Sequence, residues 1–178
     1  PVTAKIRIGW DATSVNAPHV CRLLEVCGVQ AIAVNGRTRA QGYSGEADWE
    51  VIGECAAAVS IPVIGNGDLA SGADVALRKA TTPVRGAMIG RAAMQHPWIF
   101  QETKHYLATG AHPEPVPAEE KWRFMLRHVR LAIEWGRYGK ERTTIQSMRS
   151  RLMAYSKGLP GGKHLRSRFA TIESVAQI

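Results

Sequence analysis

The sequence predicts an α/β fold: the carboxyl-terminal half of a (β/α)8 TIM barrel, followed by a small helical-bundle domain. Three observations predict this fold. Strand-sized apolar runs alternate with helix-like segments in the first 110 residues, each run ends in polar or glycine-rich residues, and the hydrophobic period becomes helical beyond a proline-rich linker. We therefore expect two domains, residues 1–110 and residues 111–178.

Four short apolar runs are expected to form strands, at residues 2–8, 31–34, 62–64 and 86–89. They begin at intervals of roughly 25 to 30 residues, separated by helix-like segments at residues 18–27, 49–59 and 72–79. Alternation at this period is typical of βα units around a parallel sheet. A further helix is expected from Pro97-Trp98 to Leu107.

The Asn35-Gly36 pair would usually indicate a hairpin turn, because it follows an apolar run. No alternating second strand comes after it. In a βα repeat the pair marks the carboxyl end of a parallel strand instead, and such ends bind ligands in α/β folds.

A complete barrel needs about 250 residues. We therefore interpret this chain, which begins on a strand, as half a barrel that belongs to a longer protein or awaits a second part. A small doubly wound sheet is the alternative architecture.

The last third of the chain differs from the rest in pattern and in charge. Pro113, Pro115 and Pro117 form a linker of extended character. Residues 111–178 carry 13 Lys and Arg against 6 Asp and Glu, whereas residues 1–110 carry 10 against 9. This asymmetry indicates binding to a polyanion, with a solvated basic surface as the alternative.

Two amphipathic helices are expected in this basic region. The first buries a face of Trp122, Leu126, Val129 and Ile133, and the second buries Ile145, Met148, Leu152 and Tyr155. The opposite face of the first helix carries four arginines, Arg123, Arg127, Arg130 and Arg137. Two or three such helices pack naturally as a short bundle.

Composition excludes several classes of protein. The apolar runs are far shorter than the ~20 residues that span a bilayer, so no membrane segment is expected. Three cysteines without a CxxC pair argue against a disulfide framework and favour a reducing, cytoplasmic setting. All three lie in predicted helices, where we interpret them as packing residues. The histidines have no metal-ligand spacing, and we expect no metal.

Two glycine-rich loops follow the last two predicted strands. "IGNGDLASG" contains Gly65 and Gly67, and "IGRAA" contains Gly90 and Arg91, each before a helix start. In consecutive barrel units, such loops indicate a phosphate site. Lys5 and Arg7 share one face of the first strand. Lys5 would suit a phosphate-bearing cofactor with an electron-rich ring, or else an ion pair with an acid such as Asp68.

The sequence resembles the tRNA-dihydrouridine synthases of bacterial type over nearly its whole length. The matching segments, in order, are "PVTAKIRIGWD", "GRTRAQGYSGEADW", "IPVIGNGD", "GAMIGRAAMQHPWIF", "MRSRLMAYSKGLPGG" and "LRSRF". In this family an FMN-binding (β/α)8 barrel precedes a helical tRNA-binding domain. NADPH reduces the FMN, which then reduces the 5,6 double bond of a tRNA uridine flipped out onto it.

The resemblance implies roles for individual residues. Lys5 would contact the flavin ring, and the ribityl phosphate would be held by Asn66, Gly67, Asp68, Gly90 and Arg91. The residues expected to contact RNA are Arg37, Arg39, Arg127, Arg130, Arg149 and Lys157.

The chain departs from the family pattern at two points. The family's general acid, a cysteine, belongs to the first half of the barrel, so we expect no catalytic residue in this chain. Asn35 replaces a flavin-contacting histidine; it can still form hydrogen bonds but cannot titrate. The alternatives are a non-catalytic RNA-binding remnant and another FMN-dependent barrel oxidoreductase that acts on a small molecule.

Overall fold

The computed structural model describes residues 1–136 and 140–178, so Arg137 lies outside the described residues. The chain divides into two compact units. The first, which we call the sheet unit, contains residues 1–93 and 99–113. The second, the helical unit, contains residues 94–98 and 114–178.

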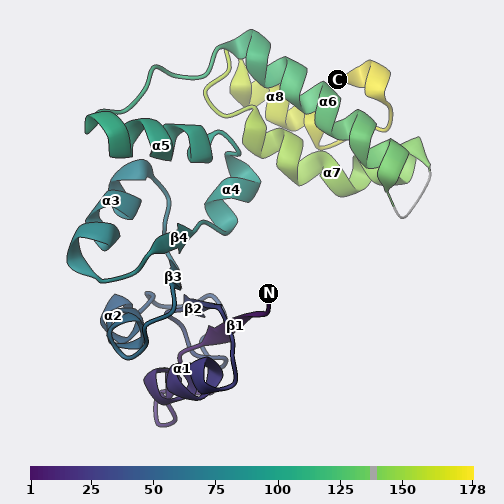
Figure 1. The fold of residues 1–178 in the computed structure, drawn as a ribbon. Helices are drawn as coiled ribbons and strands as arrows, with labels where there is room; N and C mark the ends of the chain where they lie inside the picture. The colour runs from purple at the N-terminus through teal and green to yellow at the C-terminus, as the bar shows by residue number, and fades with distance from the viewer. Residues whose placement is uncertain (137–139) are drawn as a thin grey trace. The chain divides into compact units, whose positions relative to one another are not determined.

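Four parallel strands form the sheet of the first unit (Figure 1). They are β1 (Thr3–Arg7), β2 (Ala31–Asn35), β3 (Val63–Asn66) and β4 (Gly86–Met88), and they pair in the order β1-β2-β3-β4. Each strand thus pairs with its successor in the chain, whereas a doubly wound sheet reverses its strand order at a switch point. The fold is α/β with a parallel sheet, consistent with a partial TIM barrel.

Helices connect the strands as the alternation predicts. They are α1 (Ala17–Val26), α2 (Trp49–Ala57) and α3 (Gly72–Thr81), followed after β4 by α4 (Arg91–Gln95) and α5 (Ile99–Thr109). The Asp48 side chain caps α2 by accepting from the amides of Glu50 and Val51, and the Ser71 hydroxyl caps α3 by accepting from the Asp74 amide. These caps satisfy amides that the first helical turn leaves unpaired.

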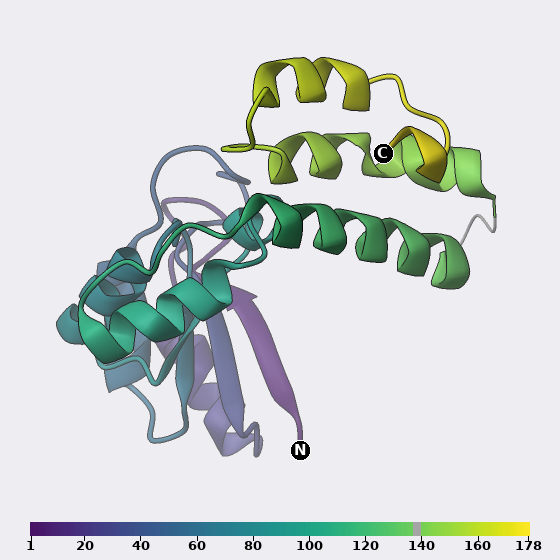
Figure 2. The ribbon, with the colours of Figure 1, turned by 90° about the horizontal axis from the view of Figure 1, so that it is seen from above.

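Within the described residues of the sheet unit, helices cover one face of the sheet and leave the other face uncovered. Ile32, Val34 and Val63 point toward the helices and pack in one core with Ile52 and Val75. Lys5 and Asn35 alternate with these core positions and therefore lie on the opposite face. Figure 2 shows β1 as the outermost strand of the sheet.

The helical unit contains α6 (Ala118–Trp135), α7 (Glu141–Tyr155), α8 (Gly162–Phe169) and a 3-10 turn (Val175–Gln177). The predicted buried face of α7 is confirmed, because all four of its residues are buried. The predicted face of α6 is partly wrong: Met125 and Val129 are its buried residues, and Leu126 is only half-buried. Met125 takes the place predicted for Leu126 in the core, against which Trp122 and Ile133 also pack.

The three cysteines differ in burial. Cys21 and Cys55 are buried in the core between α1 and α2, as expected for packing residues. The contact with Cys21, together with burial, raises the pKa of the Cys55 thiol well above its ordinary value. Cys27 is exposed at the end of α1, so the prediction that it packs is wrong.

Among the described residues, no helix combines the length and the apolar character needed to cross a bilayer.

Gly65 permits the closest contact between the sheet and α2. A Cβ on Gly65 would lie 2.6 Å from Cη2 of Trp49, whose ring is buried and whose Nε1 donates to the Gly67 carbonyl. Gly65→Ala should therefore lower the free energy of unfolding by about 1 to 3 kcal/mol, the usual cost of overpacking. Urea denaturation measures this loss.

Gly53→Ala is the matched control. A Cβ there would meet Thr82 at an ordinary 3.6 Å, inside α2. We expect it to raise stability by up to about 1 kcal/mol through helix propensity. Equal effects of the two substitutions would contradict the packing described for Trp49.

Candidate functional site

The carboxyl ends of the four strands form one row of residues across the uncovered face. Arg7 pairs with Asn35, Asn35 with Asn66, and Asn66 with Met88. One layer deeper on the same face, Lys5 pairs with Ala33 and Ala33 with Ile64. The parallel register thus brings together polar residues that are about 30 positions apart in the sequence.

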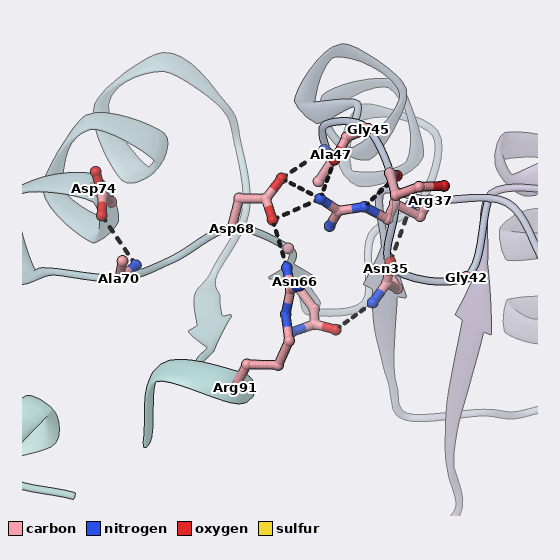
Figure 3. A network of polar contacts seen from close by, with 12 residues as sticks. Asn35, Arg37, Gly42, Gly45, Ala47, Asn66, Asp68, Ala70, Asp74 and Arg91 are labelled. Carbon is pink, nitrogen blue, oxygen red and sulfur yellow. Dashed lines mark hydrogen bonds and ion pairs between the residues drawn. The ribbon is translucent and has the colours of Figure 1, made fainter. Parts of the chain in front are cut away.

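The two asparagines tie the strand ends together. Asn35 Nδ2 donates to Asn66 Oδ1 at 2.8 Å, and Asn66 Nδ2 donates to the Met88 carbonyl at 2.7 Å (Figure 3). The Asn35 Oδ1 accepts from the Arg37 amide at 3.0 Å, which bends the chain after β2. Asn35-Gly36 therefore ends a parallel strand, as predicted, and does not form a hairpin.

A buried ion pair joins the loops that follow β2 and β3. Arg37 Nη2 donates to both carboxylate oxygens of Asp68 at 2.7 Å, and the Arg37 side chain is only 5% exposed. The same guanidinium donates to the carbonyls of Ser44 and Gly45. Because its charge and its donors are matched within the chain, Arg37 can be buried at this site.

Asp68 also binds a second arginine. Arg91 Nη2 donates to Asp68 Oδ1 at 3.0 Å, and the guanidinium stacks over Tyr43 at 5.2 Å from the ring centre. The Ala47 amide donates to Asp68 Oδ2 at 2.8 Å. Figure 3 shows the Asp68 carboxylate between Arg37 and Arg91. The carboxylate thus sets the position of both arginines.

These contacts determine the charge of Asp68. Burial opposes ionisation of the carboxyl, but hydrogen bonds from Arg37 and Ala47 and the charges of Arg37 and Arg91 outweigh it, so the pKa lies below its ordinary value. Asp68 is therefore an anion at neutral pH.

Glycines let the backbone approach closely in both predicted phosphate loops. Gly67 has a φ of 139°, and a Cβ there would overlap the methyl carbon of Ala47. At Gly90 a Cβ would meet only Asn66 Nδ2, at 3.9 Å. The surface at Gly90 is therefore open beside the asparagine row.

Lys5 is exposed on the uncovered face, and it has no ion pair among the residues that the structure describes. The alternative prediction, an ion pair between Lys5 and Asp68, is wrong because Asp68 is bound to Arg37 and Arg91 instead. The Lys5 ammonium remains available to a ligand.

The family model described as "Dihydrouridine synthase (Dus)" matches residues 1–177. The chain belongs to the dihydrouridine synthase family. A tRNA-dihydrouridine synthase B of Pseudomonas putida is 44% identical over 173 residues, which cover 97% of this chain and 50% of that protein.

Other curated relatives give the same result. A tRNA-dihydrouridine synthase B of Pseudomonas aeruginosa is 41% identical over 97% of this chain and 51% of that protein. The Vibrio vulnificus protein of the same name is 45% identical over 79% of the chain and 43% of that protein. The chain thus spans about half the length of the curated relatives it matches. Among solved structures, the YdjI aldolase from Escherichia coli K12 matches 64% of the chain and 39% of that aldolase, with 16% identity and a TM-score of 0.36, too low to support an inference.

The residues expected to contact RNA differ in their exposure. Arg39, Arg127, Arg130 and Lys157 are exposed. Arg149 donates to the carbonyls of Thr171 and Ile172, which ties α7 to the carboxyl-terminal segment. Arg37 is buried and is bonded to Asp68, and its contact with RNA stays a prediction.

The sequence did not predict two residues that hold the site in place, Arg7 and Tyr43. Arg7 Nη1 donates to the carbonyls of Thr38 and Gly42 and so holds the loop after β2. Tyr43 provides the ring on which Arg91 rests. Only the family segment "GRTRAQGYSGEADW" signals this loop, because these contacts depend on carbonyls, whose positions the residue types do not reveal.

Asp68→Asn should destabilise the protein by about 2 kcal/mol, because it leaves the buried Arg37 charge without its partner. The expected loss is below that of a fully buried pair, since the Asp68 side chain is 32% exposed. Chemical denaturation at pH 7 measures it. Glu119→Gln breaks the exposed pair with Arg123 and serves as the control, with an expected change within about 0.5 kcal/mol.

The effect of Asp68→Asn should also depend on pH. A depressed folded-state pKa means that the stabilisation is complete above the ordinary value of 3.8 and is lost as the pH falls through the folded value. The stabilities of wild type and Asp68→Asn should therefore converge in acid. A difference that stayed constant down to pH 2 would refute the assigned charge.

Proposed function

We propose that the chain is the part of a bacterial tRNA-dihydrouridine synthase that binds FMN and tRNA. The protein would use NADPH to reduce the 5,6 double bond of a tRNA uridine, in the cytoplasm. The observation that carries the proposal is the row of polar strand ends, with Lys5 beneath it, on the sheet face that the described helices of the sheet unit leave uncovered. Family membership supports the proposed reaction. The polar strand ends support this sheet face as the place where FMN would bind.

The residues on this face fit a flavin. Lys5 brings an unpaired ammonium group, and the Asn35 and Asn66 amides add polar groups at the strand ends. The open backbone at Gly90 leaves a surface that a side chain would fill. A cation, amide groups and an accessible backbone are the donor set that a polar ring with a phosphate tail requires.

Each side chain then has a role. Lys5 and Asn35 would orient the ring, while Asn66, Gly67, Gly90 and Arg91 would hold the phosphate. Arg91 uses one of its five N–H groups on Asp68, so donors remain for a phosphate. Asp68 is itself an anion and would repel a phosphate, so we assign it to positioning Arg91 and Arg37.

FMN reduced by NADPH would supply the hydride for the uridine ring. A proton donor must complete the reduction. Cys21 and Cys55 are buried in the core on the helix side of the sheet. Cys27 lies where α1 ends, near the amino-terminal ends of the strands, whereas the asparagine row lies at their carboxyl ends. The proton donor would therefore come from the rest of the protein, together with the strands that pair with the outer edge of β1 and complete the barrel.

The helical unit would bind the tRNA backbone. Residues 111–178 carry the excess of 13 basic over 6 acidic residues, and Arg127 and Arg130 are exposed on α6. Neutralising phosphates releases counterions, which makes such binding depend on salt. We expect no metal in the reaction, and no cluster of three His, Cys, Asp or Glu side chains occurs in the described part of the chain.

The flavin site can be tested in the protein that carries the complete barrel. Lys5→Met should weaken FMN binding at least about tenfold, because a charged hydrogen bond contributes about 1.5 to 3 kcal/mol. Asn35→His should keep or improve the affinity, because histidine can replace both hydrogen bonds of the amide. Quenching of FMN fluorescence measures both. Flavin bound equally well by Lys5→Met would place the ring elsewhere.

The reaction is tested by incubating unmodified tRNA with this protein and NADPH. Mass spectrometry should show a gain of two hydrogen atoms on a uridine. If the protein binds tRNA but holds no flavin, the alternative of a non-catalytic RNA-binding protein is correct.

The RNA surface can be tested by the salt dependence of tRNA binding. Arg130→Gln should reduce the slope of log K against log salt by about 1, because one phosphate contact is lost. Glu134→Gln, an exposed change on the same helix that removes no cation, should not reduce it. An unchanged slope in Arg127→Gln and Arg130→Gln alike would exclude this face of α6 from the interface.

A further inference from the structure

A cavity of about 360 Å³ lies between α6 and α7 within the helical unit. Its size falls in the range of about 300 to 1,000 Å³ that is usual for small-molecule sites. The lining includes His128, Leu131 and Trp135 from α6 and Thr144, Ser147 and Arg151 from α7. None of these residues belongs to the sheet-edge site described above.

The cavity has an aromatic wall that faces solvent. Trp135 is the last residue of α6 and is 80% exposed, and Leu131, one turn earlier, is 43% exposed. By contrast, Trp122 and Trp98 pack against neighbouring aromatic rings within this unit. A large indole surface left in water at a cavity rim is a binding surface for another flat ring.

Thr144, one of the residues that line the cavity, has a buried hydroxyl group without a partner among the described residues. Thr144 is 3% exposed, and its Oγ1 has no hydrogen bond among the described residues. In a helix this hydroxyl would usually bond the carbonyl four residues earlier. Here the Thr143 hydroxyl uses the Lys140 carbonyl, and Thr144 contributes only its backbone amide to that group. A buried hydroxyl in this state costs stability unless a ligand satisfies it.

A single charge dominates the wall opposite Trp135. Arg151 has only a long contact, 3.5 Å, to the Ser147 carbonyl. The neighbouring His128 shares a hydrogen bond with the Tyr155 hydroxyl, and burial together with the Arg151 charge lowers the pKa of His128. His128 is therefore neutral at pH 7, and no acidic side chain is among the described residues that line the cavity. The ligand should therefore have a flat ring with polar groups at its edge and a negatively charged group next to that ring.

We propose that this cavity binds one unpaired nucleotide of the RNA substrate, with its base stacked on Trp135 and its edge bonded to Thr144. Arg151 would meet the adjoining phosphate. The inference rests on the proposed function, since it takes tRNA as the ligand of this unit. It adds a site that reads a base to a unit whose other exposed basic residues we assign to the phosphate backbone.

Loss of stacking on Trp135 should change tRNA affinity without changing its salt dependence, whereas loss of a phosphate contact changes both. Trp135→Ala should weaken binding of unmodified tRNA by about tenfold, within the usual range for loss of one stacked base. The slope against log salt should not change, because no charge is removed. Trp135→Phe should recover most of the affinity, since it keeps an aromatic ring.

Thr144→Val separates a binding role from a structural one. It preserves the shape of the side chain and removes the unpartnered hydroxyl, so the melting temperature should rise while tRNA affinity falls severalfold. Val129→Thr, a change of the same two residue types within the core of the unit, should lower the melting temperature and serves as the control. A Thr144→Val variant that binds tRNA as well as wild type would remove the hydroxyl from the site.

The outcomes distinguish this inference from the proposed function. If wild-type protein fails to bind tRNA, the proposed function is wrong. If it binds with a normal salt slope but Trp135→Ala binds equally well, only the nucleotide site is wrong. If Trp135→Ala instead changes the sedimentation coefficient and leaves tRNA affinity unchanged, the cavity is a contact between copies of the protein, and the inference is overturned.

Discussion

The ion pair between Arg37 and Asp68 is the constraint on which the sheet edge depends. It joins the loop after β2 to the loop after β3, and it places a nearly fully buried guanidinium beside a carboxylate that is one-third exposed. Such a pair adds little stability compared with apolar packing, but losing one partner is costly. The position of each loop is therefore tied to the other, which is what a site assembled from several strand ends requires.

The contacts around the pair extend this constraint to the ligand face. The Asp48 amide donates to the Gly36 carbonyl at 2.7 Å, and Trp49 donates to the Gly67 carbonyl, so the start of α2 is fixed against both loops. On the other side, Asp68 holds Arg91 at the start of α4, after β4. The asparagine row and Gly90 are thus presented on a rigid edge. The proposed nucleotide site relies on a different principle, because there an exposed ring and an unpartnered hydroxyl await a ligand.

Much of the fold could be predicted from the sequence. The βα period predicted the four parallel strands, and polar residues at the strand ends predicted which edge would carry the site. Alternation placed Lys5 on the same face of its strand as Arg7, opposite the core. The pairing of particular side chains could not be predicted from the sequence. Asp68 was assigned to a phosphate and Arg37 to RNA, but the structure shows that the two residues form an ion pair. Opposite charges 31 positions apart give no local signal of contact. On α6 the prediction chose Leu126 where Met125 is buried, because a helix with apolar residues at both 125 and 126 fits two registers.

A double-mutant cycle of Arg37→Met and Asp68→Asn tests the central claim, that this pair holds the sheet edge. The free energy of unfolding is measured for wild type, both single variants and the double variant. We predict a coupling of about 2 kcal/mol, with the double variant more stable than the sum of the single losses implies, because it buries no unpaired charge. Losses that add within about 0.5 kcal/mol would show that the two residues act independently and would contradict the account.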